Sequence, residues 1–385
     1  MKILITTEVY KPVINGVVTS IENLKDNLEK LGHQVKILTL KNAELDQEDP
    51  DVYLIRSFDV ERIYSGARFG LVMDRKTLRA IDAFNPDIIH SQTEFSTFRM
   101  ARKLAKKYKV PHLHTYHTLY EDYTHYFVPS KRVGKVIAKE FTRMILLQTD
   151  AVVVPSTKIK RLLLSYGVRK EIHVVPTGID LGRFGCSAET EKQELRERLQ
   201  LDPKGLTLLA LGRVAKEKNL SELLFYLQKL NDPRIKLLIA GDGPYKKEIE
   251  EQLKQYSLSN QVIMLGMLRP ERVPTYYEIA DLFVNASQSE TQGLTTIEAM
   301  ASGTPLFCRK DECLKDVLIP GENGFTFDSY ENFREVIMFF LNDKSSLETL
   351  SQNASRIANE HFSSRSFAYK IESIYFKHLS ERSLP

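Results

Sequence analysis

Two patterns of apolar positions alternate along the chain. Short runs rich in Val, Ile and Leu predict buried strands, and longer segments with apolar residues every three or four positions predict helices. The strands expected in the first half are 2–7, 34–40, 52–57, 87–92, 111–117, 151–156 and 172–176. Those expected in the second half are 206–212, 235–243, 262–267, 281–287, 304–308 and 324–328. This alternation predicts an α/β protein with parallel sheets and crossover helices.

Pro and Gly interrupt both patterns at PTGIDLGRF, residues 176–184, and a domain boundary is expected there. With 385 residues, the chain is long enough for two domains that each bury a core. We expect an N-terminal domain over 1–180, a C-terminal domain over 181–362 and a closing helix over 363–385. We see no internal sequence repeat.

Two glutamates, Glu290 and Glu298, stand out in the stretch SETQGLTTIEAMASG. Apolar spacing predicts a helix over 293–302 with Gly303 as its stop. Eight helical residues advance about 12 Å, whereas two carboxylates that act on one glycosidic bond lie about 5–10 Å apart. The pair is therefore expected to contact two ends of one long ligand, Glu290 at a hexose and Glu298 at a ribose diol. For each residue alone, the competing interpretation is a capping or solvent-facing glutamate.

The segments around these glutamates favour a bound phosphate. The amides of Gly293, Leu294 and Thr295 open the predicted helix, and a helix N-terminus attracts anions. Upstream, the loop GRVAKEKN carries Arg213 and Lys218 directly after a predicted strand. Ligands of open parallel sheets bind beyond the carboxyl ends of the strands, and an arginine fork with a lysine charge suits a diphosphate. The alternative is a loop whose cations face water, but the two loops together favour a sugar nucleotide.

GRVAKEKN followed by E-x7-E closely resembles family 4 of the retaining glycosyltransferases. The resemblance implies the GT-B fold, in which two Rossmann-like domains face each other across a cleft and the C-terminal helix returns to the N-terminal domain. The segments 6–24, 114–126 and 283–300 look most similar to a bacterial subgroup that adds α-glucose to diacylglycerol. The form E-T-Q-G-L departs from the more usual Glu-x-Phe-Gly of the family and is shared with that subgroup.

The resemblance also implies a reaction and its residues. The donor would be UDP-glucose and the acceptor 1,2-diacylglycerol, with retention of configuration, in the synthesis of membrane glycolipid or of the lipoteichoic acid anchor. By this match, Gly16 lies near the donor phosphates, His117 lies against the hexose, and Asp122 contacts the acceptor hydroxyl. Arg213, Lys218 and Glu290 complete the expected catalytic set.

No metal or cofactor is expected to be bound for catalysis, because Arg213 and Lys218 can neutralise the leaving diphosphate; Mg²⁺ would at most stimulate. The spacing of His114, His117 and His125 is not that of a standard metal site. A D-x-D sequence at 49–51 is interpreted as a surface turn.

Basic residues concentrate in the first half, where 28 Lys and Arg in residues 1–180 face 21 Asp and Glu. Such a surface suits anionic lipid headgroups, and no nucleic-acid motif accompanies it. The expected membrane-binding residues are Arg99, Arg102, Lys103, Lys106, Lys107, Lys109, Lys131, Arg132 and Lys135. The alternative is that these cations are the solvated face of an ordinary core helix with Ala101, Leu104, Ala105 and Tyr108 on its buried side. The segment 61–84, strongly basic in the lipid subgroup, carries five cations but three acids here.

No apolar run approaches the 18 or more residues of a transmembrane helix, and MKILITTEV is expected to be a first strand rather than a signal peptide. The three cysteines lack C-x-x-C spacing and are expected to be reduced. We therefore expect a peripheral protein on the cytoplasmic face of a bacterial membrane. The alternatives are the same chemistry on a glycolipid or polysaccharide acceptor, a sugar-nucleotide epimerase, and a non-catalytic membrane partner subunit.

Overall fold

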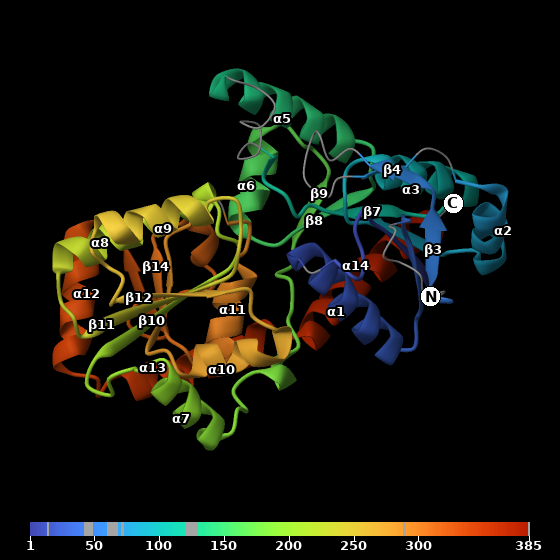
Figure 1. The fold of residues 1–385 in the computed structure, drawn as a ribbon. Coiled ribbons are helices and arrows are strands. Elements are labelled where there is room, and N and C mark those ends of the chain that lie inside the picture. Colours follow the sequence, from blue (N-terminus) through green and yellow to red (C-terminus); the bar gives the residue numbers. More distant parts are fainter. Residues whose placement is uncertain are drawn as a thin grey trace. The chain divides into compact units, whose positions relative to one another are not determined.

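The computed structural model describes residues 1–13, 15–41, 49–59, 68–70, 73–120, 130–287 and 290–383. The chain forms two compact units, each a parallel sheet flanked by helices (Figure 1). Unit 1 consists of Met1–Gly178 and Ser364–Pro385, and unit 2 of Ile179–Ser363. The predicted α/β class with parallel sheets is confirmed.

Unit 1 contains a seven-stranded sheet in the order β3-β2-β1-β6-β7-β8-β9, and every neighbouring pair is parallel. The central strands are buried on both faces because helices cover both sides, which explains their nearly continuous apolar sequences. The strands are β1 (Lys2–Thr6), β2 (Gln34–Leu40), β3 (Val52–Ile55), β6 (Ile88–Ser91), β7 (His112–Thr115), β8 (Ala151–Val154) and β9 (Glu171–Val174). The helices are α1 (Gly16–Lys30), α2 (Arg75–Phe84), α3 (Ser96–Tyr108), α5 (Lys131–Leu146), α6 (Thr157–Ser165) and α14 (Ser364–Ser383).

The last helix, α14, completes the core of unit 1, although the whole of unit 2 separates it from the rest of that unit in the sequence. It packs against α1 and buries Phe367, Ile371 and Tyr375 in one apolar cluster with strands β1 and β2. The Tyr375 hydroxyl lies 2.7 Å from Nδ1 of His90 on β6. The predicted return of the C-terminal helix to the first half of the chain is therefore confirmed.

Unit 2 contains a six-stranded parallel sheet in the order β12-β11-β10-β13-β14-β15. Apolar clusters line the two sides of this sheet. The strands are β10 (Leu206–Leu211), β11 (Ile235–Ala240), β12 (Val262–Gly266), β13 (Leu282–Asn285), β14 (Leu306–Arg309) and β15 (Gly324–Phe327). The helices are α7 (Glu189–Arg198), α8 (Leu220–Leu230), α9 (Lys246–Gln255), α10 (Val273–Glu278), α11 (Leu294–Ala301), α12 (Tyr330–Asn342) and α13 (Leu347–His361).

Several strands end earlier than predicted, and β11 shows why. It stops at Ala240 instead of residue 243, because Gly241 turns the chain with a φ of +129°. A Cβ on Gly241 would lie 1.9 Å from the carbonyl oxygen of Gly212. The loops that follow β10 and β11 therefore touch backbone to backbone, which only glycine permits here.

One element was not predicted at all, a short antiparallel pair of β4 (Ser57–Asp59) and β5 (Arg68–Gly70). Each of its strands has only three residues, and such strands are too short to produce an alternating pattern.

Candidate active site

The loops that follow the strands of unit 2 line a pocket that is open to solvent. It lies at the carboxyl ends of the strands, where open parallel sheets bind ligands. Four of the predicted site residues meet there: Arg213, Lys218, Glu290 and Thr295. The rest of the lining is apolar or glycine apart from one asparagine, namely Ala210, Leu211, Gly212, Leu220, Ile239, Ala240, Val284, Asn285 and Ala286.

Lys218 and Glu290 form an ion pair at this pocket, although 72 residues separate them in the sequence. Lys218 ends the 3₁₀ turn η3 (Lys216–Lys218) after β10, and Glu290 lies in the loop between β13 and α11. Both side chains are largely buried, so their charges interact more strongly than an exposed pair would. The lysine is thus held by a carboxylate, with Arg213 exposed on the same loop.

A second ion pair and two hydrogen bonds hold the η3 loop in place. Asn219 adopts the left-handed conformation at φ +53° and donates from Nδ2 to Oε2 of Glu222 at 2.6 Å. The other oxygen of Glu222 pairs with Arg309 at the end of β14. Ser287, after β13, also donates to the carbonyl oxygen of Glu217 at 3.4 Å. Sequence analysis missed Glu222 and Arg309, since neither belongs to the motifs and only the fold brings them together.

The helix predicted over 293–302 is α11, which runs from Leu294 to Ala301. Gly293 caps its N-terminus at φ +78°, and a Cβ there would come within 3.0 Å of Oγ1 of Thr296. The first amides of a helix have no partner within the helix. Because Thr295 also lines the pocket, this helix start can receive an anion from it.

Glu298 lies further along α11 and is not among the residues that line this pocket. Its Oε2 accepts a hydrogen bond of 3.0 Å from the hydroxyl of Tyr277 on α10. Burial raises the pKa of Glu298 to about 7, against the lowering effects of that hydrogen bond and of the Arg183 charge. Only the ionised form of this carboxyl group is purely an acceptor for ligand hydroxyls.

In unit 1, Gly16 is the first residue of α1, and Asn15 caps that helix by accepting from the amide of Val18 at 2.9 Å. His117 follows β7, and its Nε2 lies 2.8 Å from Oε1 of Gln92. Burial, assisted by His114, lowers the pKa of His117 to about 3, so the ring is neutral at pH 7. Since the amide oxygen of Gln92 can only accept, Nε2 is the donor in this contact. The predicted acceptor contact Asp122 lies outside the described residues, as does His125.

A buried polar cluster near His117 was not predicted. His114 lies with its Nε2 3.3 Å from Oε1 of Glu94, and the hydroxyl of Tyr120 donates to the other oxygen of that carboxylate. Beside them, Glu8 accepts from the amide of Thr97 at 2.6 Å, at the start of α3. Burial raises the pKa of Glu8. Glu8, Glu94 and Tyr120 follow β1, β6 and β7, and His114 lies near the end of β7, so the cluster occupies the carboxyl ends of adjacent strands. No sequence spacing reveals that.

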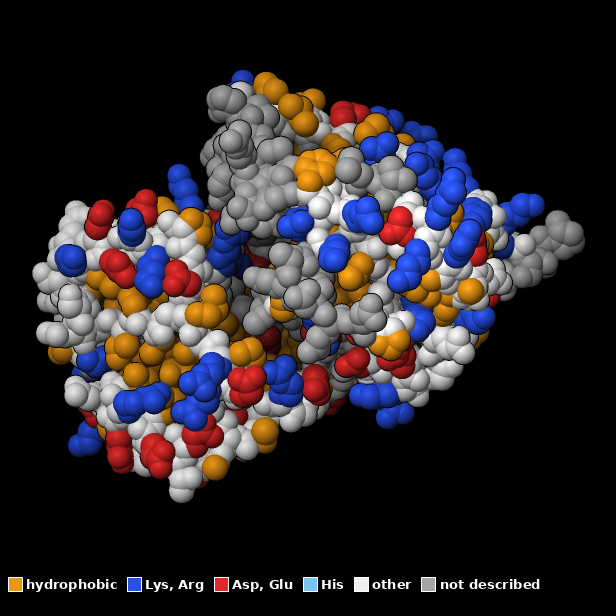
Figure 2. Space-filling view, turned by 45° about the vertical axis from the view of Figure 1, so that its right-hand side comes forward, with side chains coloured by type: hydrophobic (Ala, Val, Ile, Leu, Met, Phe, Trp, Pro, Cys, Tyr) orange, Lys and Arg blue, Asp and Glu red, His pale blue; other side chains and the backbone are white. Residues whose placement is uncertain are grey.

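The six predicted basic residues between 99 and 109 are all exposed on α3 or at its end. Ala101, Leu104 and Ala105 are buried on the other side of the helix, so the core stripe exists as well. Lys107 pairs with Asp82. Lys and Arg side chains gather at the upper right of Figure 2, over the part of unit 1 that carries α3.

The helix α5 exposes apolar side chains beside cations. Val136, Ile137 and Met144 are 61%, 52% and 57% exposed, and Val133 and Leu147 are exposed at its two ends. These positions form one helical face, which we call the α5 stripe (Val133, Val136, Ile137, Met144 and Leu147). Orange side chains lie at the top of Figure 2, at the height of α5 in Figure 1. The exposed cations of α5 include Arg132 and Lys135, and Lys131 is the first residue of the helix.

None of the helices in the described parts of the chain is both long enough and apolar enough to span a bilayer.

In the D-x-D sequence, Asp51 is held by Lys25 and Lys36 in ion pairs of 3.2 and 2.5 Å. The cysteines are free thiols: Cys186 is exposed, and Cys308 and Cys313 are buried.

Comparison with known proteins identifies the chain. The model of the family described as "Glycosyltransferase Family 4" matches residues 14–183, and that of "Glycosyl transferases group 1" matches residues 191–357. An alpha-monoglucosyldiacylglycerol synthase of Streptococcus pneumoniae is 34% identical over 97% of this chain and 86% of its own length. The chain belongs to glycosyltransferase family 4. The family predicted from GRVAKEKN and E-x7-E is thereby confirmed.

Other relatives agree with this assignment. The glycosyltransferase is 32% identical to an alpha-monoglucosyldiacylglycerol synthase of Acholeplasma laidlawii, over 97% of this chain and 96% of that protein. A crystal structure of HepE from Anabaena in complex with UDP superimposes with a TM-score of 0.77 at 18% identity, covering 98% and 100% of the two chains. The sucrose-phosphate synthase of Thermosynechococcus elongatus gives 0.78 at 21%, covering 99% of both. The GT-B fold is therefore shown.

Acid is expected to destabilise unit 1 of the glycosyltransferase, because it buries neutral histidines. Burial lowers the pKa of His112, like that of His117, to about 3. An unfolded histidine has a pKa near 6.5, so between pH 6.5 and 3 the unfolded chain binds more protons and stability falls as pH falls. From pH 7 to pH 5 each histidine should cost about 2 kcal/mol of unfolding free energy.

Urea unfolding followed by tyrosine fluorescence at several pH values measures this loss. The contribution of Glu298 in unit 2 to the pH dependence of stability has the opposite sign, because its raised carboxyl pKa makes the folded state more stable as pH falls from 7 towards 4.5. The variant His117→Asn should lose part of the acid sensitivity of unit 1, while His361→Asn, at an exposed histidine of unit 2, should keep all of it. Equal acid sensitivity in the two variants would contradict the assignment to His117.

Proposed function

We propose that this glycosyltransferase transfers glucose from UDP-glucose to 1,2-diacylglycerol with retention of configuration, giving α-glucosyl-diacylglycerol. The observation that carries the proposal is the pocket of unit 2, where Arg213 and the Lys218–Glu290 pair meet the start of α11. This set provides two cations and unpaired helix amides for a diphosphate, and a carboxylate for sugar hydroxyls. Two relatives above 30% identity are alpha-monoglucosyldiacylglycerol synthases, and HepE was crystallised with UDP-glucose.

In this proposal the donor binds to unit 2. The diphosphate lies against Arg213, Lys218 and the amides that follow Gly293, and Glu298 accepts from the ribose diol. Glu290 fixes Lys218 and accepts from a hexose hydroxyl. As the bond from glucose to the diphosphate breaks, these fixed positive groups stabilise the charge that develops on the leaving oxygen. No metal ligand is needed at this point.

On the family resemblance we assign three residues of unit 1 to the reaction: Gly16 to the donor phosphates, His117 to the hexose and Asp122 to the acceptor hydroxyl. Since the His117 ring is neutral, it acts as a hydrogen-bond partner rather than as a cation. The acceptor hydroxyl attacks on the face that the diphosphate leaves, and the leaving phosphate oxygen takes its proton. This route retains configuration without a covalent intermediate.

We assign the membrane surface to the cations of α3 and to the α5 stripe with its neighbouring cations. An exposed apolar helix face among basic residues matches an anionic lipid surface, because the apolar side chains enter the acyl boundary while Lys and Arg contact headgroups. Each basic residue near such a surface contributes about 1 kcal/mol. The enzyme would thus be a peripheral protein of the cytoplasmic membrane face.

Product analysis tests this function. The purified chain is incubated with a panel of UDP- and GDP-sugars and with vesicles that contain anionic lipid plus diacylglycerol or monoglucosyl-diacylglycerol. We expect one hexose added to diacylglycerol from UDP-glucose, with an α anomeric proton in the NMR spectrum of the product. Transfer only to the glucosylated lipid or to a polysaccharide would show that diacylglycerol is not the acceptor. Consumption of the donor without any acceptor would indicate an epimerase or hydrolase. The absence of turnover would indicate a non-catalytic partner subunit.

A further inference from the structure

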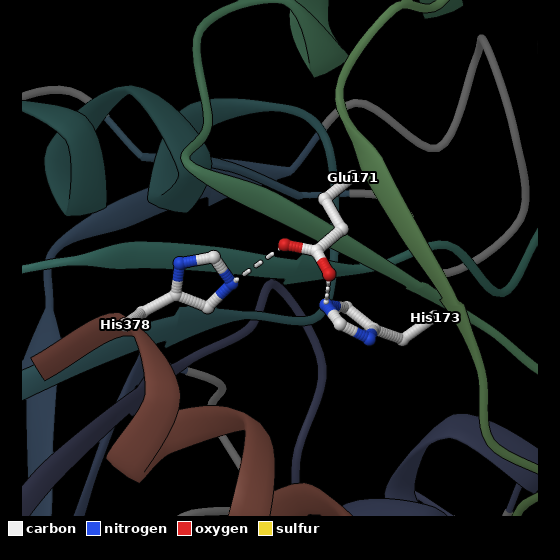
Figure 3. Close-up of side chains that lie close together, drawn as sticks. All are labelled: Glu171, His173 and His378. Atoms are coloured by element: carbon white, nitrogen blue, oxygen red, sulfur yellow. Dashed lines mark ion pairs between the residues drawn. The ribbon is translucent and has the colours of Figure 1, made fainter. Parts of the chain in front are cut away.

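Two histidines and a glutamate meet where α14 packs on β9 (Figure 3). Glu171 and His173 are two residues apart on β9, so both side chains lie on the same face of this edge strand. His378 approaches the same carboxylate from α14. One ligand atom of each residue lies within 4.8 Å of the other two.

The two imidazole rings face the carboxylate without hydrogen bonding to it. Nε2 of His173 lies 3.4 Å from Oε1 of Glu171, and Nε2 of His378 lies 3.8 Å from Oε2. Both Nε2 atoms are buried and have no hydrogen-bond partner. Such buried, unpaired polar atoms are costly unless a further group joins them.

The environment of His378 directs its free nitrogen into the cluster. Its Nδ1 lies 3.1 Å from Oε2 of Glu381, one turn further along α14. This carboxylate favours the proton on Nδ1 and leaves the lone pair of Nε2 pointing towards Glu171. A carboxylate behind a histidine in this way is the usual support for a histidine that ligates a metal.

The spacing fits a tetrahedral metal ion. Bonds of about 2.0–2.2 Å place the ligand atoms of a tetrahedral zinc site roughly 3.4 Å apart. The three ligand atoms here lie within 4.8 Å of one another, so small side-chain movements would bring them to that spacing. We propose that Glu171, His173 and His378 bind a divalent transition-metal ion, of which Zn²⁺ fits best, and that this ion fastens α14 to the edge of the unit 1 sheet. Two imidazoles and one carboxylate suit zinc, and the exposed side of Glu171 leaves the fourth position to water.

This site lies outside the proposed active site and has no part in glycosyl transfer. A competing cation is already present, because Lys377 pairs with Glu171. The ammonium group of Lys377 and a metal ion would use the same carboxylate, so the metal must displace a flexible, partly exposed side chain. Lys160 also acts on His173 through its charge. The proposal therefore predicts that removing the charge of Lys377 tightens metal binding.

The experiment uses the full chain without a histidine tag, stripped with a chelator. Zn²⁺ is titrated against a chromophoric chelator, and Co²⁺ is added separately to record its visible spectrum. We expect one ion per chain, a tetrahedral Co²⁺ spectrum, and greater protection of the α14 amides from hydrogen exchange with zinc. His173→Ala and His378→Ala should each weaken binding by at least about tenfold.

Two further variants keep the proposal open to contradiction even if a histidine variant folds poorly, which circular dichroism would reveal. Lys377→Gln, at the surface, should bind zinc more tightly than the unmodified chain. His361→Ala removes an exposed histidine of unit 2 and should leave the affinity unchanged. The proposal is overturned if the unmodified chain binds no zinc at micromolar concentration, if affinity survives in folded His173→Ala and His378→Ala, or if Lys377→Gln fails to tighten binding.

Discussion

Replacing Lys218 with alanine is expected to lower kcat for the proposed glucosyl transfer by about 10²–10³-fold, the typical cost of removing one group that stabilises developing charge in a closed site. Lys218 is the partly buried cation of the pocket, and its ammonium group is held in place by Glu290. Glu290→Gln keeps the size of the side chain but removes the negative charge that orients the lysine. We expect a similar loss from it.

The two residues should also act as a unit. Because they are in direct contact, the double variant Lys218→Ala, Glu290→Gln should cost little more than either single change, whereas independent residues would show additive losses. Lys216→Ala is the matched control, since Lys216 is exposed on the same 3₁₀ turn and does not line the pocket. Rates measured with radiolabelled UDP-glucose decide the question: full turnover in either single variant removes that residue from the mechanism.

Placing aspartates at Val136 and Ile137 is expected to weaken binding to anionic vesicles by on the order of 10²-fold or more. Both side chains lie exposed in the middle of the α5 stripe, so the change should not disturb the core. Burial of an apolar side chain contributes about 1.5–3 kcal/mol, and a new negative charge is repelled by anionic headgroups. Transfer to diacylglycerol in vesicles should fall with binding.

The matched control is Met267→Asp, which places one aspartate on the most exposed large apolar side chain of unit 2, 76% exposed and remote from α5 in the sequence. Vesicle sedimentation measures binding, and the two-residue variant should keep its affinity for UDP in solution. Reversing the charges of Lys103 and Lys106 on α3 should weaken vesicle binding. This loss should become smaller as the salt concentration increases, because salt screens exposed charges. Unchanged sedimentation of the α5 variant would remove this helix from the membrane surface.

The pattern of apolar residues was sufficient to predict both sheets, because parallel strands covered on two sides leave continuous apolar runs. It placed the ends of strands less well. The predicted strand 235–243 includes GDG, but backbone contact between Gly241 and Gly212 forces a turn after Ala240. That contact joins two loops, and no local pattern encodes it.

The candidate site divides in the same way. Arg213, Lys218, Glu290 and Thr295 follow from two motifs, and the structure brings them to one pocket. The pair of Glu222 with Arg309 and the cluster of Glu8, Glu94 and His114 could not be predicted, because each depends on which strand ends are neighbours in the sheet. The basic residues of α3 were compatible with both a membrane surface and an ordinary solvated helix face, since a helix can bury one side and carry charged residues on the other.

The position of α14 has a consequence for biosynthesis. Residues 1–178 leave the ribosome first, but the apolar face formed by α1 and the strands beside it is closed by Phe367, Ile371 and Tyr375. At about 5–20 residues per second, translating unit 2 delays this closure by on the order of ten seconds or more. A nascent chain that has completed only its first half therefore exposes the apolar residues of this cluster that α14 later covers, and loss of α14 would destabilise unit 1 although the change lies beyond unit 2 in the sequence.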